Sequence, residues 1–215
     1  MSVAANVHNY NRDYTCIFCN EIAKVEALRS MGKKQNALHN QSYIAETDSL
    51  ILLPDVNPIV PGHILIVTKK HMLGFAQAEK KIFEDFSKIN DFLINFSSQY
   101  SNNYFFFEHG ASKIIKNTGG CIDHAHIHFI PSAIDILPYI APFSQKKVSL
   151  EPILMSSAFP ENGVDYLFYQ NMDGNGCIIL EPKKPLPRQF VRMIMAKEYG
   201  LKEWDWRKSP LGKIQ

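Results

Sequence analysis

Three histidines alternate with apolar residues between positions 124 and 130, where the chain reads HAHIHFI. Successive side chains of a strand point to opposite faces, so this pattern predicts a strand over residues 122–130 with His124, His126 and His128 in one row, their Cα atoms about 6.6 Å apart. In such a row, one imidazole is placed to attack a phosphorus while another meets its oxygens. The triplet alone is equally typical of a metal site, or of a half-buried strand whose polar face uses histidine.

Composition narrows the class of protein. With 215 residues, 46% of them hydrophobic and 20% charged, the chain is long and apolar enough for a full core, which predicts one globular domain with elaborations. The formal net charge of +2 gives no reason to expect a nucleic-acid surface. Neither an apolar signal-peptide core nor a run of about 20 apolar residues is present, so we expect a cytoplasmic protein with no membrane partner.

Periodicity predicts an α+β fold, with an antiparallel sheet of about five strands and one long packing helix. Apolar residues recur at three and four positions in the predicted helix, and the strands are bounded by proline, glycine and aspartate. A β-hairpin and a short helix follow nearer the C-terminus. In chain order we expect strands at 43–47, 49–53 and 63–68, a helix at 78–100, strands at 104–107 and 122–130, the hairpin at 165–170 and 177–181, and a helix at 187–199.

The same reading divides the chain into three parts. Residues 1–13 are polar and asparagine-rich and are expected to be a flexible arm. Residues 14–131 carry the sheet, the long helix and the histidine row. Residues 132–215 are expected to be a C-terminal extension packed on the same domain, with no function that the sequence alone assigns.

Two motifs together resemble the histidine triad (HIT) family of nucleotide hydrolases and transferases. The first is the row itself, since the family pattern is His-φ-His-φ-His-φ-φ with φ apolar. The second is the segment DVNPIVPGHILIV at residues 55–67, followed by KKH at 69–71, which is similar to the strand–loop–strand that holds the nucleoside in that family. The resemblance covers roughly residues 14–131 and implies a HIT-like fold, of the kind that larger bacterial members carry with a C-terminal extension.

By this resemblance, His126 is the nucleophile that attacks the α-phosphorus of a nucleotide and forms a covalent nucleotidyl-histidine. His128 is expected to meet the nonbridging oxygens, and His124 completes the catalytic row. The uridylyltransferase branch has glutamine at the third position, so His128 favours a hydrolase. Asp55 aligns with the acid that binds the ribose, although an aspartate beside Pro54 is also typical of a capped loop.

The resemblance also implies a slot for the base and a loop around the phosphates. The residues that match the apolar slot are Ile17, Phe18, Ile22 and Val56, and the same residues would serve equally well in a plain core. In the loop, small members of the family usually have Gly-Gln-Ser/Thr where this chain has Gly119, Gly120 and Cys121, so the glutamine that contacts the leaving group is missing. Candidates to replace it from the same loop are Lys113, Lys116, Asn117 and Thr118.

A structural zinc site is a second expectation. Four cysteines are too few for a disulfide scaffold, and in a reducing compartment a Cys-x-x-Cys pair is a metal or redox candidate. With two histidines, the pair resembles the Cys₂His₂ set of several family members, a closed tetrahedral set that clamps segments together. The implied ligands are Cys16, Cys19, His71 and His124. The alternatives are that the cysteines are small buried hydrophobic residues, or that His63 or His39 is the ligand.

The leading interpretation is therefore a hydrolase of a dinucleoside polyphosphate, with a divalent cation on the polyphosphate, or of a nucleoside phosphoramidate. A purine nucleotide is its expected partner. The alternatives are a phosphorylase or nucleotidyltransferase that uses the same adduct, and a nucleotide-binding module without turnover. Members of the family commonly form homodimers, which makes a homodimer a candidate here, although an extension such as the one after Pro131 can replace or block that contact.

Overall fold

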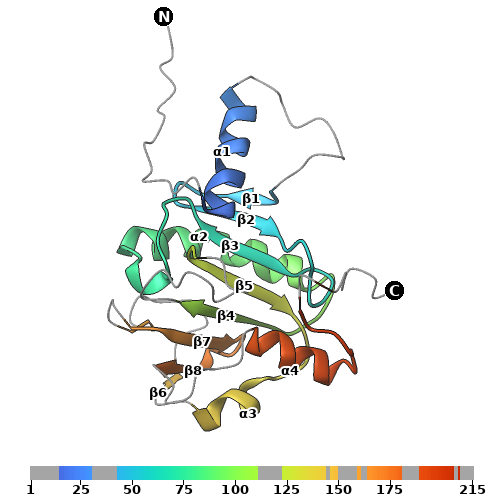
Figure 1. Cartoon of the computed structure of the whole chain (residues 1–215). Coiled ribbons are helices and arrows are strands. Elements are labelled where there is room, and N and C mark those ends of the chain that lie inside the picture. The colour runs from blue at the N-terminus through green and yellow to red at the C-terminus, as the bar shows by residue number, and fades with distance from the viewer. Residues whose placement is uncertain are drawn as a thin grey trace, which may run out of the picture.

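An antiparallel sheet organises the computed structural model, which describes residues 15–30, 43–110, 123–143, 146–149, 159–160, 164–180, 189–205 and 208 (Figure 1). Eight strands lie within these residues, in the spatial order β1-β2-β3-β5-β4-β7-β8-β6. Their bounds are β1 Ala45–Glu46, β2 Leu50–Pro54, β3 Ile64–Thr68, β4 Tyr104–Gly110, β5 His126–Pro131, β6 Lys146–Ser149, β7 Tyr166–Asn171 and β8 Asn175–Leu180. The expected α+β class and antiparallel sheet are confirmed.

The strand count is larger than the sequence predicted. We expected about five strands followed by a separate hairpin, whereas β7 pairs with β4 over six residues, and β8 and β6 continue the same sheet. Six of the seven residues of β4 are buried, so pairing with β7 satisfies backbone groups that water does not reach. The extension is therefore continuous with the sheet, while the division of the chain at residues 131 and 132 stays a prediction.

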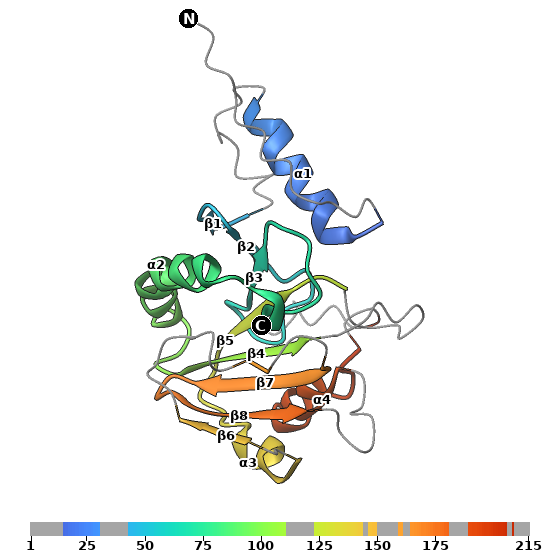
Figure 2. The same cartoon turned by 90° about the vertical axis from the view of Figure 1, so that its left-hand side faces the viewer.

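Helices cover both faces of the sheet (Figure 2). Helix α2 (Lys80–Ser97) lies on one face and buries Ile82, Phe86, Ile89 and Leu93, the spacing that the sequence predicts for an amphipathic helix. Helix α1 (Ile17–Ser30) packs against residues of β2 and β3 that point to the opposite face. Helix α4 (Phe190–Glu198) packs against residues of β4, β7 and β8 that point to this second face. The short helices are η1 (Phe75–Gln77), α3 (Leu137–Ile140) and η2 (Ala141–Phe143).

The histidine row lies between α1 and α4 on that second face. His126 and His128 stand opposite Val67 and Leu65 of β3, which pack under α1. On the other side of β5, His128 stands opposite Phe107 of β4, which packs under α4. Directly opposite residues of an antiparallel pair share a face, so the two histidines occupy the strip between the two helices.

The predicted strand over residues 122–130 starts later than expected. Strand β5 begins at His126, and the chain bends at residues 123 and 124, so His124 precedes the strand. The Ala125 N–H donates to the carbonyl of Met72 at 2.6 Å, which fixes the chain to the loop after β3 before the ladder begins. The His124 side chain turns toward Cys16 at the start of α1. The sequence predicted three histidines in a row on one strand, whereas only His126 and His128 lie on β5 and His124 precedes it.

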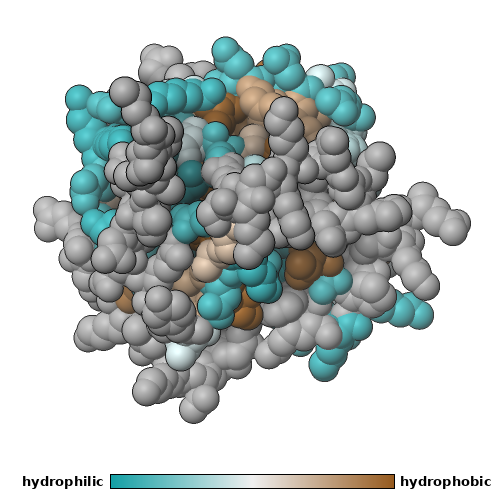
Figure 3. Space-filling model, turned by 90° about the horizontal axis from the view of Figure 1, so that it is seen from above, coloured by the Kyte–Doolittle hydropathy of each residue, from teal (hydrophilic) through white to brown (hydrophobic). Residues whose placement is uncertain are grey.

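Several expectations fall on other parts of the chain. The predicted arm at residues 1–13 and the loop with Gly120 and Cys121 lie outside the described residues. Within the described part, no helix has the length and apolar character needed to cross a bilayer. Seen from above, the described surface mixes hydrophilic and hydrophobic side chains (Figure 3). Among the exposed large apolar residues are Ile17 and Val56, at 55% and 82% exposure.

Candidate active site and metal centre

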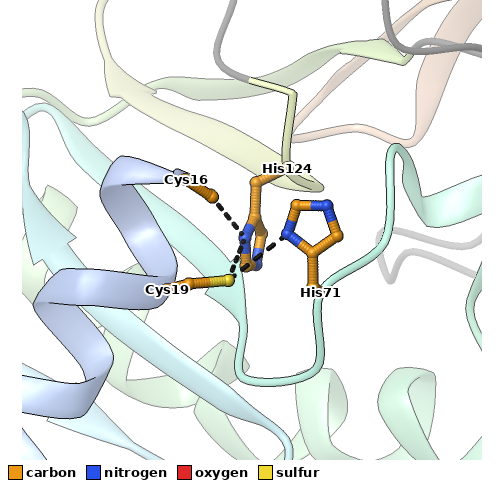
Figure 4. Close-up of side chains that lie close together, drawn as sticks. All are labelled: Cys16, Cys19, His71 and His124. Carbon is orange, nitrogen blue, oxygen red and sulfur yellow. Dashed lines mark hydrogen bonds between the residues drawn. The ribbon is translucent and has the colours of Figure 1, made fainter. Parts of the chain in front are cut away.

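The two cysteines and two histidines predicted as metal ligands lie together at the start of α1 (Figure 4). The sequence forms this corner because Phe18, Ile22 and Val25 recur at the spacing of one helix face, which seats α1 on the sheet and brings Cys16 and Cys19 to the histidines. One ligand atom from each of the four residues lies within 4.8 Å of all the others. The alternative ligand His63 lies in a different cluster, and His39 is outside the described residues.

The sulfur–nitrogen distances in this cluster fit tetrahedral coordination of a metal ion. The Sγ atoms of Cys16 and Cys19 are 3.3 Å and 3.6 Å from His124 Nδ1, and Cys19 Sγ is 3.3 Å from His71 Nδ1. Zinc bonds of about 2.3 Å to sulfur and 2.0–2.1 Å to nitrogen, at a tetrahedral angle, place S and N about 3.6 Å apart. His124 Nε2 donates to the Thr68 carbonyl at 2.7 Å, so its Nδ1 lone pair faces the sulfurs. The donor set can hold a metal ion.

His126 is arranged as a neutral base with one free lone pair. Its Nδ1 lies 2.6 Å from the carbonyl oxygen of His124, and because a carbonyl only accepts, Nδ1 carries the proton. The Nε2 atom of the neutral ring is then unprotonated. Burial lowers the pKa of His126, which outweighs the opposing effect of the bond to His124. The ring is therefore in the state that a nitrogen nucleophile requires.

His128 is arranged as a donor by a relay through His63. The backbone N–H of Ile59 donates to His63 Nδ1 at 3.2 Å, so the proton of the neutral His63 ring is on Nε2. That Nε2 lies 2.9 Å from His128 Nδ1 and donates to it, which leaves the His128 proton on its own Nε2. Burial lowers the pKa of both rings well below the ordinary value, so both stay neutral at pH 7.

Packing fixes the orientation of the two triad rings in the strip. The His128 ring stacks on Phe107 with centroids 4.2 Å apart and planes 1° apart. The His126 and His128 centroids are 4.9 Å apart, and Phe18 meets the His126 ring edge-on at 5.2 Å. A lone pair and a donor proton are thus held side by side, which is an arrangement suited to a phosphorus atom and the oxygen bound to it.

Asp55 lies beside the relay, near the His63 nitrogen that donates to His128. Its Oδ2 is 3.6 Å from His63 Nε2, and its Oδ1 accepts a hydrogen bond from the Asn57 N–H at 2.7 Å. The bond to Asn57 is the loop-capping contact that the sequence left open as an alternative. Desolvation raises the pKa of Asp55, while the Arg192 guanidinium and the Asn57 bond lower it. Asp55, His63 and His128 could also surround an ion, but the proton on His63 Nε2 favours the relay.

The residues predicted for the base slot lie in two different environments. Ile17 and Val56 are exposed, whereas Phe18 and Ile22 are 4% and 1% exposed and pack in the cluster under α1. Phe18 still reaches the histidine rings by its edge. That these four residues hold a base stays a prediction, and so does the role of Gly120 and Cys121, which lie outside the described residues.

The C-terminal extension contributes contacts that the sequence did not reveal. Tyr166 of β7 donates a short hydrogen bond to Glu108, a buried carboxylate that also accepts from the backbone N–H groups of Phe75 and His126. Arg192 of α4 donates to the carbonyl of Asn57, beside Asp55. No local motif predicts either contact, because Tyr166 lies 58 positions from Glu108 and Arg192 lies 135 positions from Asn57 in the sequence. The sequence offers one weak signal, an arginine among the apolar residues of the predicted C-terminal helix, and its burial is seen only in the structure.

The match to a known domain follows this geometry. A model of the HIT domain matches residues 37–133, which include the Asp55 loop, His63 and all three histidines of the row. Residues 37–133 are thus similar to a HIT domain, while α1 precedes the matched region and β7, β8 and α4 follow it.

Solved structures with partial similarity include three bacterial proteins. A HIT family protein from Bacillus anthracis is 18% identical, over 58% of this chain and 77% of that chain, with a TM-score of 0.42. A HIT family hydrolase from Clostridium thermocellum is 19% identical, over 58% of this chain and 96% of that chain, with a TM-score of 0.39. A protein from Streptococcus mutans is 17% identical, over 58% and 73% of the respective chains, with a TM-score of 0.43.

Proposed function

We propose that the protein is a nucleotide hydrolase that cleaves at the α-phosphorus of a dinucleoside polyphosphate or a nucleoside phosphoramidate. The observation that carries this proposal is the protonation pattern of the two histidines. His126 presents an unprotonated Nε2, and His128 presents an Nε2–H beside it. A nucleophile next to a fixed donor is the pair of groups that in-line displacement at phosphorus needs.

In the first step, the lone pair of His126 Nε2 attacks the α-phosphorus. The bond from phosphorus to the leaving oxygen or nitrogen breaks, and the leaving group departs with its electron pair and takes up a proton from solvent. The hydrogen bond from His126 Nδ1 to the His124 carbonyl strengthens as the ring gains positive charge, because charge-assisted bonds are stronger than neutral ones. The product is a nucleotidyl-histidine.

In the second step, water attacks the same phosphorus and the bond to His126 breaks. The ring recovers its lone pair, the water loses a proton, and a nucleoside monophosphate leaves. Throughout, His128 Nε2–H is placed to donate to a nonbridging oxygen whose charge grows in the transition state, an effect worth about 10²–10³ in rate in comparable sites. Inorganic phosphate in place of water would give the phosphorylase alternative.

We further propose that zinc occupies the Cys16, Cys19, His71 and His124 cluster and stabilises the fold. All four coordination positions would be filled by protein ligands, so the ion would tie α1 to the segment before β5 and would not activate water. His124 would then hold the ion through Nδ1, while its carbonyl holds the His126 proton. In this arrangement the metal site fixes the position of the nucleophile's hydrogen-bond partner.

The test is phosphorus NMR of the purified protein with diadenosine tetraphosphate and, separately, with AMP-phosphoramidate. We expect AMP as a product from the native protein, none from His126→Ala, and slow turnover from His128→Ala, which keeps the nucleophile. Each reaction is repeated with inorganic phosphate, and the appearance of ADP from the phosphoramidate would favour the phosphorylase. Unchanged turnover in a folded His126→Ala variant would refute the mechanism, and AMP binding without any turnover would favour the binding module.

A further inference from the structure

A buried arginine from the C-terminal helix lies against the loop that carries Asp55. Arg192 is 6% exposed, although the rest of the buried face of α4 is apolar. Burying a guanidinium is costly unless hydrogen bonds and opposite charges surround it. The contacts that offset this cost therefore show what the side chain does.

Those contacts converge on one turn of the loop between β2 and β3, the loop that carries Asp55. Both terminal nitrogens of Arg192 donate to the carbonyl oxygen of Asn57, Nη1 at 3.0 Å and Nη2 at a shorter distance. Nη2 also lies 3.7 Å from Asp55 Oδ1, the oxygen that caps the same turn through the Asn57 N–H. Arg192 thus holds the turn at its carbonyl while Asp55 holds it at its N–H.

The chain on both sides of α4 places a second carboxylate whose charge acts on Arg192. Gln189, which precedes the helix, adopts a left-handed backbone with φ of 57°, and its amide donates to Asp205 Oδ1 at 3.0 Å. Asp205 is a buried carboxylate whose charge acts on Arg192, as does that of Asp55. A non-glycine residue in this conformation is unusual and persists where surrounding contacts fix it. The guanidinium is therefore stabilised by the charges of two carboxylates, Asp55 within the matched HIT region and Asp205 after it.

We propose that Arg192 is a positioning residue that fixes Asp55 for recognition of the ribose diol, so that the C-terminal extension forms part of the nucleotide site. This inference rests on the hydrolase function proposed above. A carboxylate accepts from two vicinal hydroxyls only when it is ionised and correctly turned. Arg192 supplies both conditions, because its charge favours the ionised form of Asp55 and its fork fixes the turn that Asp55 caps. The substrate class is then ribonucleotides and not dideoxynucleotides.

The experiment compares the affinities for AMP and for 2′,3′-dideoxy-AMP, measured by calorimetry on the full chain. In the native protein we expect AMP to bind more tightly by on the order of tenfold or more, as expected for a charged acceptor that binds two hydroxyls. In Arg192→Met this ratio should fall toward one, mainly through weaker AMP binding. Asp55→Asn should have the same effect, and the double variant should lose no more than either single one.

Two further variants separate positioning from general stability. Lys197→Met removes an exposed cation from the same helix and should leave the ratio unchanged. Arg192→Lys keeps the charge without the planar fork and should give an intermediate ratio, and it decides the question if Arg192→Met does not fold. Urea unfolding of each variant verifies that a folded protein is measured.

The outcomes distinguish this inference from the proposed function. A native ratio retained in folded Arg192→Met or Arg192→Lys, with turnover intact, would overturn the role of Arg192 and leave the hydrolase standing. Equal weakening of both ligands would also overturn it, since that result indicates general disruption. A native protein that binds neither nucleotide would overturn both proposals.

Discussion

Replacing His63 with leucine tests whether His128 depends on the relay. Leucine has a similar volume and no polar atoms, so His63→Leu removes one acceptor and one donor from the buried pair. Two groups then lose their partners: the Ile59 N–H and His128 Nδ1. A buried polar group left without a partner costs about 1–3 kcal/mol, so the free energy of unfolding should fall by roughly 2–6 kcal/mol.

The same change should slow catalysis without greatly changing substrate binding. Without His63, His128 Nδ1 no longer has a donor that forces the proton onto Nε2, and the ring keeps only its stacking on Phe107. Removing a donor outright costs about 10²–10³ in rate in comparable sites. Loss of its tautomer and orientation should cost less, on the order of 10–100-fold in kcat. The assay is steady-state AMP-phosphoramidate hydrolysis, with urea unfolding on the same samples.

A double variant distinguishes the relay from a general structural effect. In a His128→Leu background, His63→Leu should lower kcat no further, because the group on which it acts is gone. His63→Gln, whose amide still donates, should recover part of the rate. If His63→Leu lowers stability while kcat stays at the native value, or if the two substitutions multiply in kcat, the relay is refuted and His63 is a core residue.

Two further results are expected. Cys19→Ser should release about one zinc per chain and lower the melting temperature, whereas Cys177→Ser, at a buried cysteine outside the cluster, should retain the metal; equal zinc content by atomic absorption would contradict the site. In pH-dependent urea unfolding, stability should be greatest near pH 6.5. Below pH 6.5, the unfolded chain binds protons at His63 and His128, whereas the lowered pKa values of both residues keep them neutral in the folded protein, so the free energy of unfolding falls. Above pH 6.5, folded Glu108 keeps its proton up to its raised pKa of about 8 while the unfolded chain has released that proton, so the free energy of unfolding falls as the pH rises toward 8. A free energy of unfolding that does not change below pH 6.5 would contradict the assignment to His63 and His128.

The sequence predicted the fold where the pattern is local. The 3.6-residue period of α2 and the alternation at the start of β5 each belong to one segment, and the face that each segment buries follows from it. The ligand cluster was also predictable, because Cys16 and Cys19 are neighbours on one helical turn and His124 belongs to the motif. That these residues lie close together in space was predicted only from the resemblance to the HIT family, because periodicity does not show which helix packs beside which strand.

Other features depend on contacts that no local pattern records. The bend that ends the histidine row at His126 follows from the bond between Ala125 and Met72, a residue in a different loop. The pairing of β7 with β4 depends on two strands more than fifty positions apart. Arg192 resembled one more basic residue in a C-terminal helix until the structure placed it against Asn57. These features are set by tertiary packing, which overrides what each segment prefers alone.

The pairing of β7 with β4 bears on how two copies of the chain could associate. Strand β4 is hydrogen-bonded to β5 on one side and to β7 on the other, so neither of its edges is open to a second copy. Among the described residues, the outer strands of the sheet are β1 and β6, which have two and four residues. Short edge strands are poor templates for pairing between chains. Within the described part of the chain, β4 therefore offers no edge from which a second copy could continue the sheet, because β7 of the extension that also carries Arg192 is paired there.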